Sequence, residues 1–281
     1  MSQAVSAGQP SLSGGWWLDV AGMRDALHAE WTKLRTVAGP AWLLAATVVL
    51  TVAVSAAATA AARCPSGTVC PKDTTKLSLT GIQAGQAVVA ILAVLAISGE
   101  YSTGMIRITL ATMPRRSAVL AAKAVILAAL VLAAGAIAVG GSVLAGRILL
   151  PGHGFTVARG FPLESVADGP TLRAAAGSVL YLVLIALLSL GIATLIRDSA
   201  AAIGVVLGLL YLSPIILGVV TDPVWSHRLE RYAPMSAGLT IQDTTGLRSL
   251  PISPWGGLGV LAAWAAVALL AGVVFLRWRD A

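Results

Sequence analysis

The sequence predicts an all-α membrane protein, and three observations support this fold class. Charged residues make up 11% of the 281 residues, whereas about 25% is usual in soluble domains. Apolar residues reach 57%, and the mean hydropathy is +0.87. Long apolar runs follow one another along most of the chain. A soluble fold of this size would lack the charged surface it needs in water, so we expect several membrane spans.

The net charge of +7 does not indicate a nucleic-acid-binding protein. No basic run with interleaved aromatic residues accompanies it. Lysine and arginine in loops that face anionic lipid headgroups or a partner protein account for such an excess.

The N-terminal 39 residues divide into a polar tail and an amphipathic helix. Residues 1–15 carry no charged side chain and are expected to be disordered. Residues 16–39 predict a helix in the membrane interface, since tryptophan lies on the apolar side and basic residues lie near the end. An ordinary helix packed on a soluble domain is the alternative. The apolar stripe has helical spacing and comprises Trp16, Val20, Met23, Leu27, Trp31 and Leu34.

Residues 40–281 form the predicted transmembrane domain of six helices. Each apolar run has about 19 to 28 residues, which is enough to cross ~30 Å of hydrocarbon as a helix. Only helices suit these runs, because unpaired backbone groups are costly in lipid. Abundant alanine and glycine predict close packing in one bundle. The expected spans are residues 40–62, 80–98, 118–145, 172–196, 200–220 and 256–276, and apolar residues beyond 145 leave the end of the third open.

The connections between spans carry local signals. Residues 197–199 are so few that the fourth and fifth spans must form a helical hairpin, with Asp198 or Ser199 as the N-cap of the fifth. Residues 221–255 contain four prolines and interfacial aromatic residues, which predicts a structured cap with short helices. In the loop at 147–171, His153 is expected to be solvated.

The loop after the first span contains both cysteines of the chain, Cys64 and Cys70. Six positions apart around proline and glycine, they could form a disulfide in an oxidising compartment. Two free thiols are the alternative. We expect no metal site, because two cysteines without a nearby histidine supply too few ligands.

The spans contain few ionisable side chains, of which Lys123 lies at one end of the third. Ion-driven transporters keep acidic or histidine groups at membrane depth, because a buried charge is costly and is retained for function. The sequence also has no P-loop, HExxH motif, nucleophile elbow or paired carboxylates. We therefore expect neither an ion-driven transporter nor an enzyme, and no cofactor in this chain.

Several segments together resemble the permease subunits of type-2 ATP-binding-cassette exporters, particularly those of actinobacteria. The most specific is GEYSTGMIRITLATMPRR at 99–116, within the charged segment Ser98–Lys123. Supporting segments are AEWTKLRT at 29–36, Arg197-Asp198, RYAPMSAG at 231–238 and the basic ending at 277–280. The resemblance covers nearly the whole chain after residue 16.

The resemblance implies an ABC-2 exporter that moves a substrate by alternating access. In that family the interfacial helix is a cytoplasmic elbow, and a coupling helix between spans two and three sits in a groove of a separate ATPase subunit. Two permeases, identical or paralogous, form a dimer with two ATPases, and ATP and Mg²⁺ bind the partner subunit. Here the coupling helix would be Thr103–Met113. The residues assigned to coupling are Glu100, Tyr101, Gly104, Ile106, Arg107, Leu110, Met113, Pro114, Arg115 and Arg116.

Several alternatives accompany this assignment. The arginines at 115 and 116 could serve only to fix topology, Glu100 could be a solvated charge at a helix end, and Ile106, Leu110 and Met113 could rest on the lipid. The whole chain could also be a membrane anchor or sensor that transports nothing. Orientation is also open, because the segments that would face the cytoplasm hold ten of the 19 Lys and Arg residues. Basic clusters before the first span and after the last favour cytoplasmic termini in the cell membrane.

Overall fold

The computed structural model describes residues 38–64, 73–102, 116–156, 161, 168–219 and 222–278, and this part of the chain is helical without strands. Six of its helices are long and apolar enough to span a membrane, as predicted, and the chain is a multi-pass membrane protein by this criterion. These helices are α2 (Ala38–Ala61), α4 (Ile82–Ser102), α6 (Arg116–Leu149), α7 (Gly169–Ile196), α8 (Ser199–Leu217) and α11 (Pro254–Trp278). The predicted tail at 1–15 and most of the predicted interfacial helix at 16–39 lie outside the described residues.

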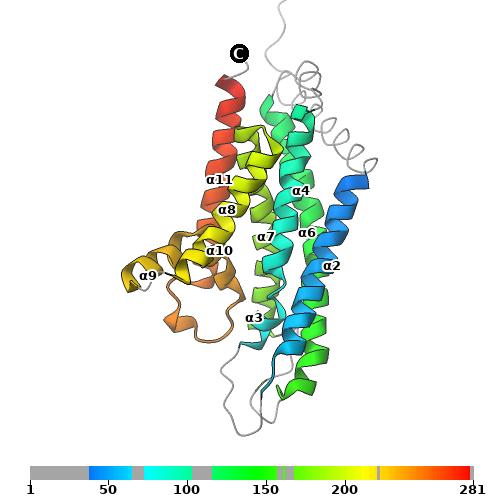
Figure 1. The fold of residues 1–281 in the computed structure, drawn as a ribbon, viewed down its shortest axis with the longest axis vertical. Coiled ribbons are helices and arrows are strands. Elements are labelled where there is room, and N and C mark those ends of the chain that lie inside the picture. Colours follow the sequence, from blue (N-terminus) through cyan, green and yellow to red (C-terminus); the bar gives the residue numbers. More distant parts are fainter. Residues whose placement is uncertain are drawn as a thin grey trace, which may run out of the picture.

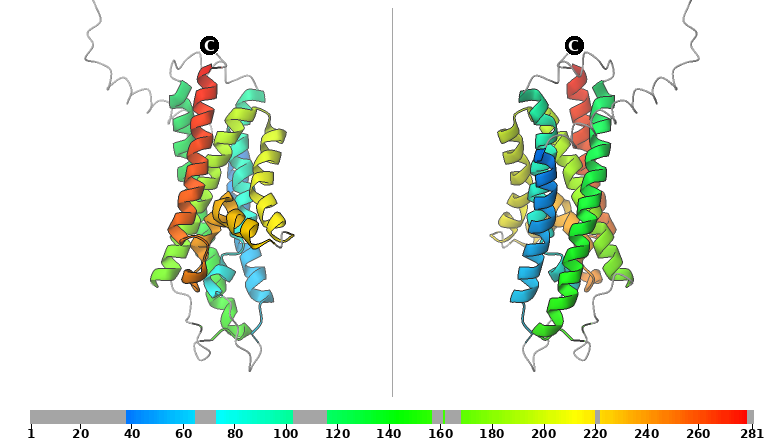
Figure 2. Two further views of the ribbon diagram at one scale, coloured as in Figure 1. Left: turned by 90° about the vertical axis from the view of Figure 1, so that its left-hand side faces the viewer. Right: turned by 90° about the vertical axis from the view of Figure 1, so that its right-hand side faces the viewer.

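The six long helices run side by side along the long axis of the molecule (Figure 1, Figure 2). Helix α7 is central and packs against α4, α6, α8 and α11, while α2 packs against α4 and α6. We call the end of the bundle that carries Ser102, Arg116 and Trp278 the near end. The far end is the opposite one, where α7 and α11 begin.

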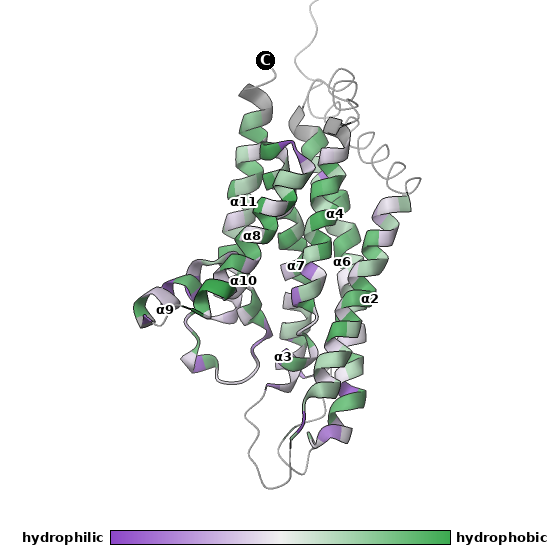
Figure 3. Ribbon diagram, viewed as in Figure 1, coloured by the Kyte–Doolittle hydropathy of each residue, from purple (hydrophilic) through white to green (hydrophobic). Residues whose placement is uncertain are grey.

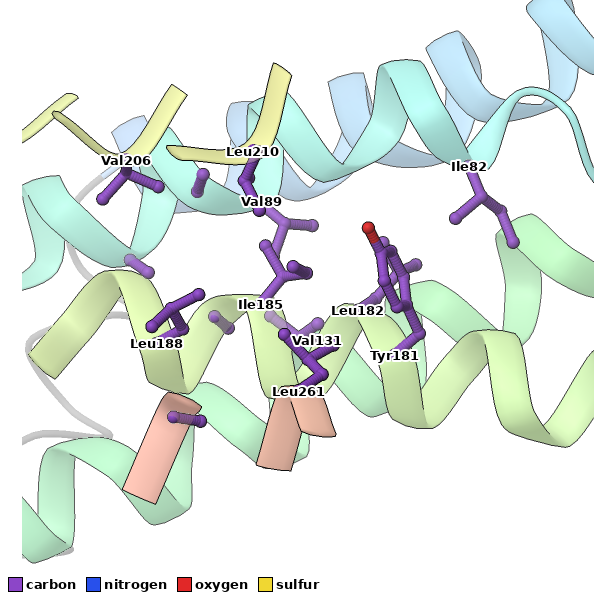
Figure 4. Packing of buried hydrophobic residues seen from close by; sticks show 14 of the residues in the cluster. Ile82, Val89, Val131, Tyr181, Leu182, Ile185, Leu188, Val206, Leu210 and Leu261 are labelled. Carbon is purple, nitrogen blue, oxygen red and sulfur yellow. The ribbon is translucent and has the colours of Figure 1, made fainter. Parts of the chain in front are cut away.

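The core surrounds α7 because its side chains are buried on several faces. Figure 4 shows Leu182, Ile185 and Leu188 of α7 packed with Val89 of α4 and Leu261 of α11. In lipid, such packing is driven by van der Waals contact and hydrogen bonds more than by removal of apolar surface from water. Close fit between helices therefore decides the stability of this bundle.

Small residues permit that close fit, as their abundance predicted. A Cβ atom added to Gly85 of α4 would lie 2.1 Å from Oγ1 of Thr51 on α2. Thr51 belongs to a buried stripe of hydroxyl side chains on α2, which recurs at every fourth position and comprises Thr47, Thr51, Ser55 and Thr59. Ser55 also accepts a hydrogen bond, at 3.0 Å, from the backbone N–H of Gly81 just before α4.

The third span is longer than predicted. Helix α6 has 34 residues, about 51 Å at 1.5 Å per residue, whereas the hydrocarbon layer needs ~30 Å. It passes through Gly140 and Gly141 without a break and continues into the 3-10 turn η1 (Leu150–His153). The sequence left this end open because the apolar run continues past residue 145. Glycine is tolerated inside a membrane helix that neighbouring helices support.

His153 is partly exposed, but it lies in a helical turn and not in the irregular loop that was expected. His153 ends η1, and its Nδ1 lies 2.8 Å from the Leu149 carbonyl oxygen. Its own carbonyl accepts a hydrogen bond, at 3.0 Å, from the backbone N–H of Cys64. The residue therefore belongs to the packed far end.

The predicted cap between the last two spans is present as four short helical elements. These are α9 (Pro223–Tyr232), α10 (Pro234–Leu239), η3 (Thr240–Gln242) and η4 (Leu247–Ser249). A further short helix, α3 (Thr74–Ser78), lies before α4. In Figure 3 the long helices are mainly apolar, and hydrophilic colours occur at the short elements and the helix ends.

The predicted hairpin between spans four and five also has the expected N-cap. Arg197 adopts a left-handed backbone, with φ of 61°, and ends α7. The Asp198 carboxylate then accepts a hydrogen bond from the Ala201 N–H at 2.7 Å. This bond satisfies one of the free N–H groups that begin α8.

Candidate functional site

Most residues assigned to coupling lie outside the described residues. Gly104, Ile106, Arg107, Leu110, Met113, Pro114 and Arg115 fall within 103–115. Glu100 and Tyr101 belong to the last turn of α4, and Arg116 is the first residue of α6. The two helix ends that flank the segment therefore lie at the near end. The coupling role of these residues stays a prediction.

Of the other predicted site residues, only Cys64 lies within the described residues. The interfacial stripe of Trp16, Val20, Met23, Leu27, Trp31 and Leu34 lies outside the described residues. Cys64 is buried and disulfide-bonded. Cys70, the other cysteine of the chain, lies outside the described residues, so the pairing of the two stays a prediction.

A buried polar layer inside the bundle was not predicted. The Tyr181 hydroxyl of α7 donates a hydrogen bond to Oε1 of Gln86 on α4. Gln86 Nε2 in turn donates to the Met235 sulfur of α10 at 3.2 Å. Tyr181 and Gln86 are fully buried, and Figure 4 shows the Tyr181 hydroxyl directed away from its own helix.

Close packing also connects this polar layer to the cap. A Cβ atom added to Gly238 of α10 would lie 2.6 Å from Cε2 of Tyr181. Next along the cap, Gln242 of η3 donates a hydrogen bond, at 3.2 Å, to the Ser178 hydroxyl of α7. Three parts of the sequence thus meet at Ser178 and Tyr181 of α7. The signal available in the sequence was the polar pair Gln83 and Gln86 inside an apolar run.

A second polar cluster closes the far end, and we call it the far-end clasp: Asp73, Lys76, Arg173, Asp243, Thr244 and Thr245. The Asp73 carboxylate caps α3 by accepting from the Lys76 N–H at 3.1 Å. The same carboxylate accepts from the backbone N–H groups of Thr244 and Thr245 and from the Thr244 hydroxyl.

An ion pair completes the clasp. Lys76 Nζ lies 2.7 Å from Oδ1 of Asp243. Arg173, in the first turns of α7, donates to the Asp243 carbonyl oxygen. The clasp therefore joins the segment before α4, the cap and the start of α7. It lies where connections between the spans meet at the far end.

The two clusters differ in their chemistry, because one is neutral and buried and the other is charged. None of the six described spans contains aspartate or glutamate within its apolar limits, and their charged side chains, Lys123, Arg147 and Arg173, lie toward helix ends. Within the described residues no three His, Cys, Asp or Glu side chains group together to hold a metal ion. The interior contains neutral hydrogen-bonding groups, and the far-end clasp contains charged ones.

Comparison with known proteins adds no family assignment. No protein-family model matches this chain, and no curated protein matches it either. The class established by the helices is a multi-pass, all-α membrane protein.

Proposed function

We propose that this chain is the permease subunit of an ABC-2 exporter, driven by a separate ATPase. The observation that carries the proposal is the segment 99–116, whose sequence resembles the family's coupling region. Its flanking helix ends, of α4 and α6, lie at the same end of a six-span bundle (Figure 1, Figure 2). An ATPase bound there would contact both helices at once. The chain itself is then not an enzyme, and ATP and Mg²⁺ belong to the partner.

The interior supports a transport route that does not use ion coupling. Because the spans carry no carboxylate at membrane depth, the energy for transport would come from another protein. Movement of α4 relative to α7 would pass directly through the Gln86–Tyr181 contact. The far-end clasp would be the closed state of the outer opening in an alternating-access cycle.

The test is ATP-dependent flux in vesicles that contain the chain and an ATPase encoded beside it. In the coupling variant, Glu100→Ala is combined with Arg115→Glu and Arg116→Glu, and we expect at least a tenfold loss of substrate-stimulated ATP hydrolysis. Arg248→Glu, an exposed far-end change, is the matched control and should leave hydrolysis unaltered. Intact stimulation in the coupling variant would contradict the coupling assignment.

A membrane anchor or sensor makes the opposite prediction. It would bind the ATPase through the same segment but give no ATP-dependent flux for any substrate offered. Binding of the ATPase without flux would therefore contradict the permease proposal and support the anchor or sensor.

A further inference from the structure

An apolar groove lies on the flank of the bundle between α8, α9 and α11. It has a volume of about 440 Å³, within the range of ~300–1,000 Å³ that is usual for small-molecule sites. Leu212 and Ile216 of α8 form one wall, and Trp225, Leu229 and Trp264 supply others. Arg228 is the one charged residue that lines it.

Helix α9 forms the edge of this groove and is held at an angle to the long helices. Figure 1 and the left view of Figure 2 show it crossing the direction of the bundle. Asp222 caps its start by accepting from the Val224 N–H at 2.8 Å. At its end, Trp264 Nε1 of α11 donates to the Tyr232 carbonyl oxygen at 3.0 Å. Both ends are therefore fixed.

The length of α8 would place α9 at the headgroup level of a bilayer. Helix α8 has 19 residues, about 28 Å, so it reaches from one edge of the hydrocarbon layer to the other. Helix α9 follows it directly, with apolar Trp225 and Leu229 toward the groove. His227, Glu230 and Arg231 do not line the groove. An amphipathic helix of this composition is typical of the membrane interface.

Charge favours a phosphate at the edge of the groove. The Arg228 guanidinium lies 5.7 Å from the centre of the Trp225 ring. Among the described residues Arg228 forms no ion pair. The apolar spans of a second copy would bring no carboxylate to it, since the six described spans contain none within their apolar limits. A lipid phosphate would supply the missing negative charge.

We propose that this groove is a binding site for an anionic phospholipid. One acyl chain lies between α8 and α11, and the phosphate binds Arg228 at the start of the groove. Trp225 and Tyr232, each 58% exposed, flank the headgroup, as interfacial aromatic residues do. The proposal concerns the chain in its membrane and holds whether or not the chain transports a substrate.

Native mass spectrometry of the purified full chain tests this site, with phosphatidylglycerol and phosphatidylcholine as probes. We expect the wild-type chain to retain phosphatidylglycerol preferentially. Arg228→Gln should reduce that preference about tenfold, because it removes one charged hydrogen bond to the phosphate. The matched control is Arg248→Gln, which alters an exposed arginine away from the groove and should keep the preference.

A second pair of variants tests the groove itself. Leu212→Trp fills it and should reduce retention of both lipids, whereas Val205→Trp, at an exposed α8 position outside the groove, should not. Equal retention of the two lipids by the wild type would overturn the proposal. An unchanged preference in Arg228→Gln would also overturn it. Displacement of the bound lipid by glycerol phosphate, which has the anion but no acyl chain, would do the same. A dimer that Leu212→Trp dissociates without loss of lipid would assign the groove to a second copy.

Discussion

Tyr181 of α7 contacts both a neighbouring span, α4, and the cap helix α10. It is fully buried on α7, it donates to Gln86 of α4, and its ring occupies the space that a side chain at Gly238 would need. A buried amide oxygen in an apolar interior is costly when it has no hydrogen-bond donor. The phenol group therefore fixes the position of α4 and of the cap relative to α7.

Replacing Tyr181 by phenylalanine should destabilise the bundle by about 1–3 kcal/mol, because Gln86 Oε1 loses its donor. Thermal unfolding of the purified chain in detergent measures the change. Tyr232→Phe is the matched control, since Tyr232 is exposed, and it should stay within ~0.5 kcal/mol of the wild type. Equal stability of the two variants would contradict a structural role for the hydroxyl.

At the scale of the element, helix α7 is held by close contact with α11 at two glycines. A Cβ atom added to Gly191 would lie 2.6 Å from the backbone carbon of Ala268. From the other side, a Cβ atom on Gly272 would lie 2.1 Å from Oγ1 of Thr194. Backbones at this distance exclude any larger residue. The composition predicted such packing, but it did not say which glycines perform it.

Gly191→Leu should therefore separate α7 from α11 and lower stability by at least ~1–3 kcal/mol, the usual cost of overpacking. The same substitution at Gly140 is the control, because nothing lies within 4 Å of a Cβ atom added there. Thermal unfolding of both variants in detergent gives the comparison. The interpretation fails if the two glycines tolerate leucine equally.

At the scale of the whole molecule, the near end and the far end of the bundle carry different features. The near end holds the ends of α4 and α6 that flank the segment 103–115. The far end holds the clasp, in which Asp73 and Asp243 join parts of the chain about 170 residues apart, as the Asp73–Thr244 separation of 171 positions shows. Under the proposed function, ATP would act at one end and the substrate would leave through the other.

Locking the clasp should therefore stop transport. A carbodiimide joins a lysine to a carboxylate without a spacer, and Lys76 Nζ lies 2.7 Å from Asp243 Oδ1. We expect the cross-linked chain to keep binding its ATPase but to lose ATP-dependent flux. Peptide mass spectrometry measures the extent of cross-linking, and Asp243→Asn should remain active after treatment. Full flux through a completely cross-linked chain would show that the far end opens elsewhere.

Much of the architecture follows from local properties of the sequence. Apolar run length predicts where helices cross a bilayer, because each residue adds a fixed rise. The short link at 197–199 predicts the hairpin, and Asp198 caps α8 as expected. The coupling segment and the interfacial helix rest on resemblance and pattern, and they remain predictions.

The sequence by itself determined the class of protein, the six spans and the small-residue packing, since hydropathy, helical rise and side-chain size act locally. The tertiary structure alone decided which residues meet. Gln86, Tyr181 and Met235 come from three separate segments, as do Asp73, Arg173 and Asp243. Contacts between distant segments depend on how the helices rotate and pack against one another. That arrangement is a property of the whole bundle, and no single span encodes it.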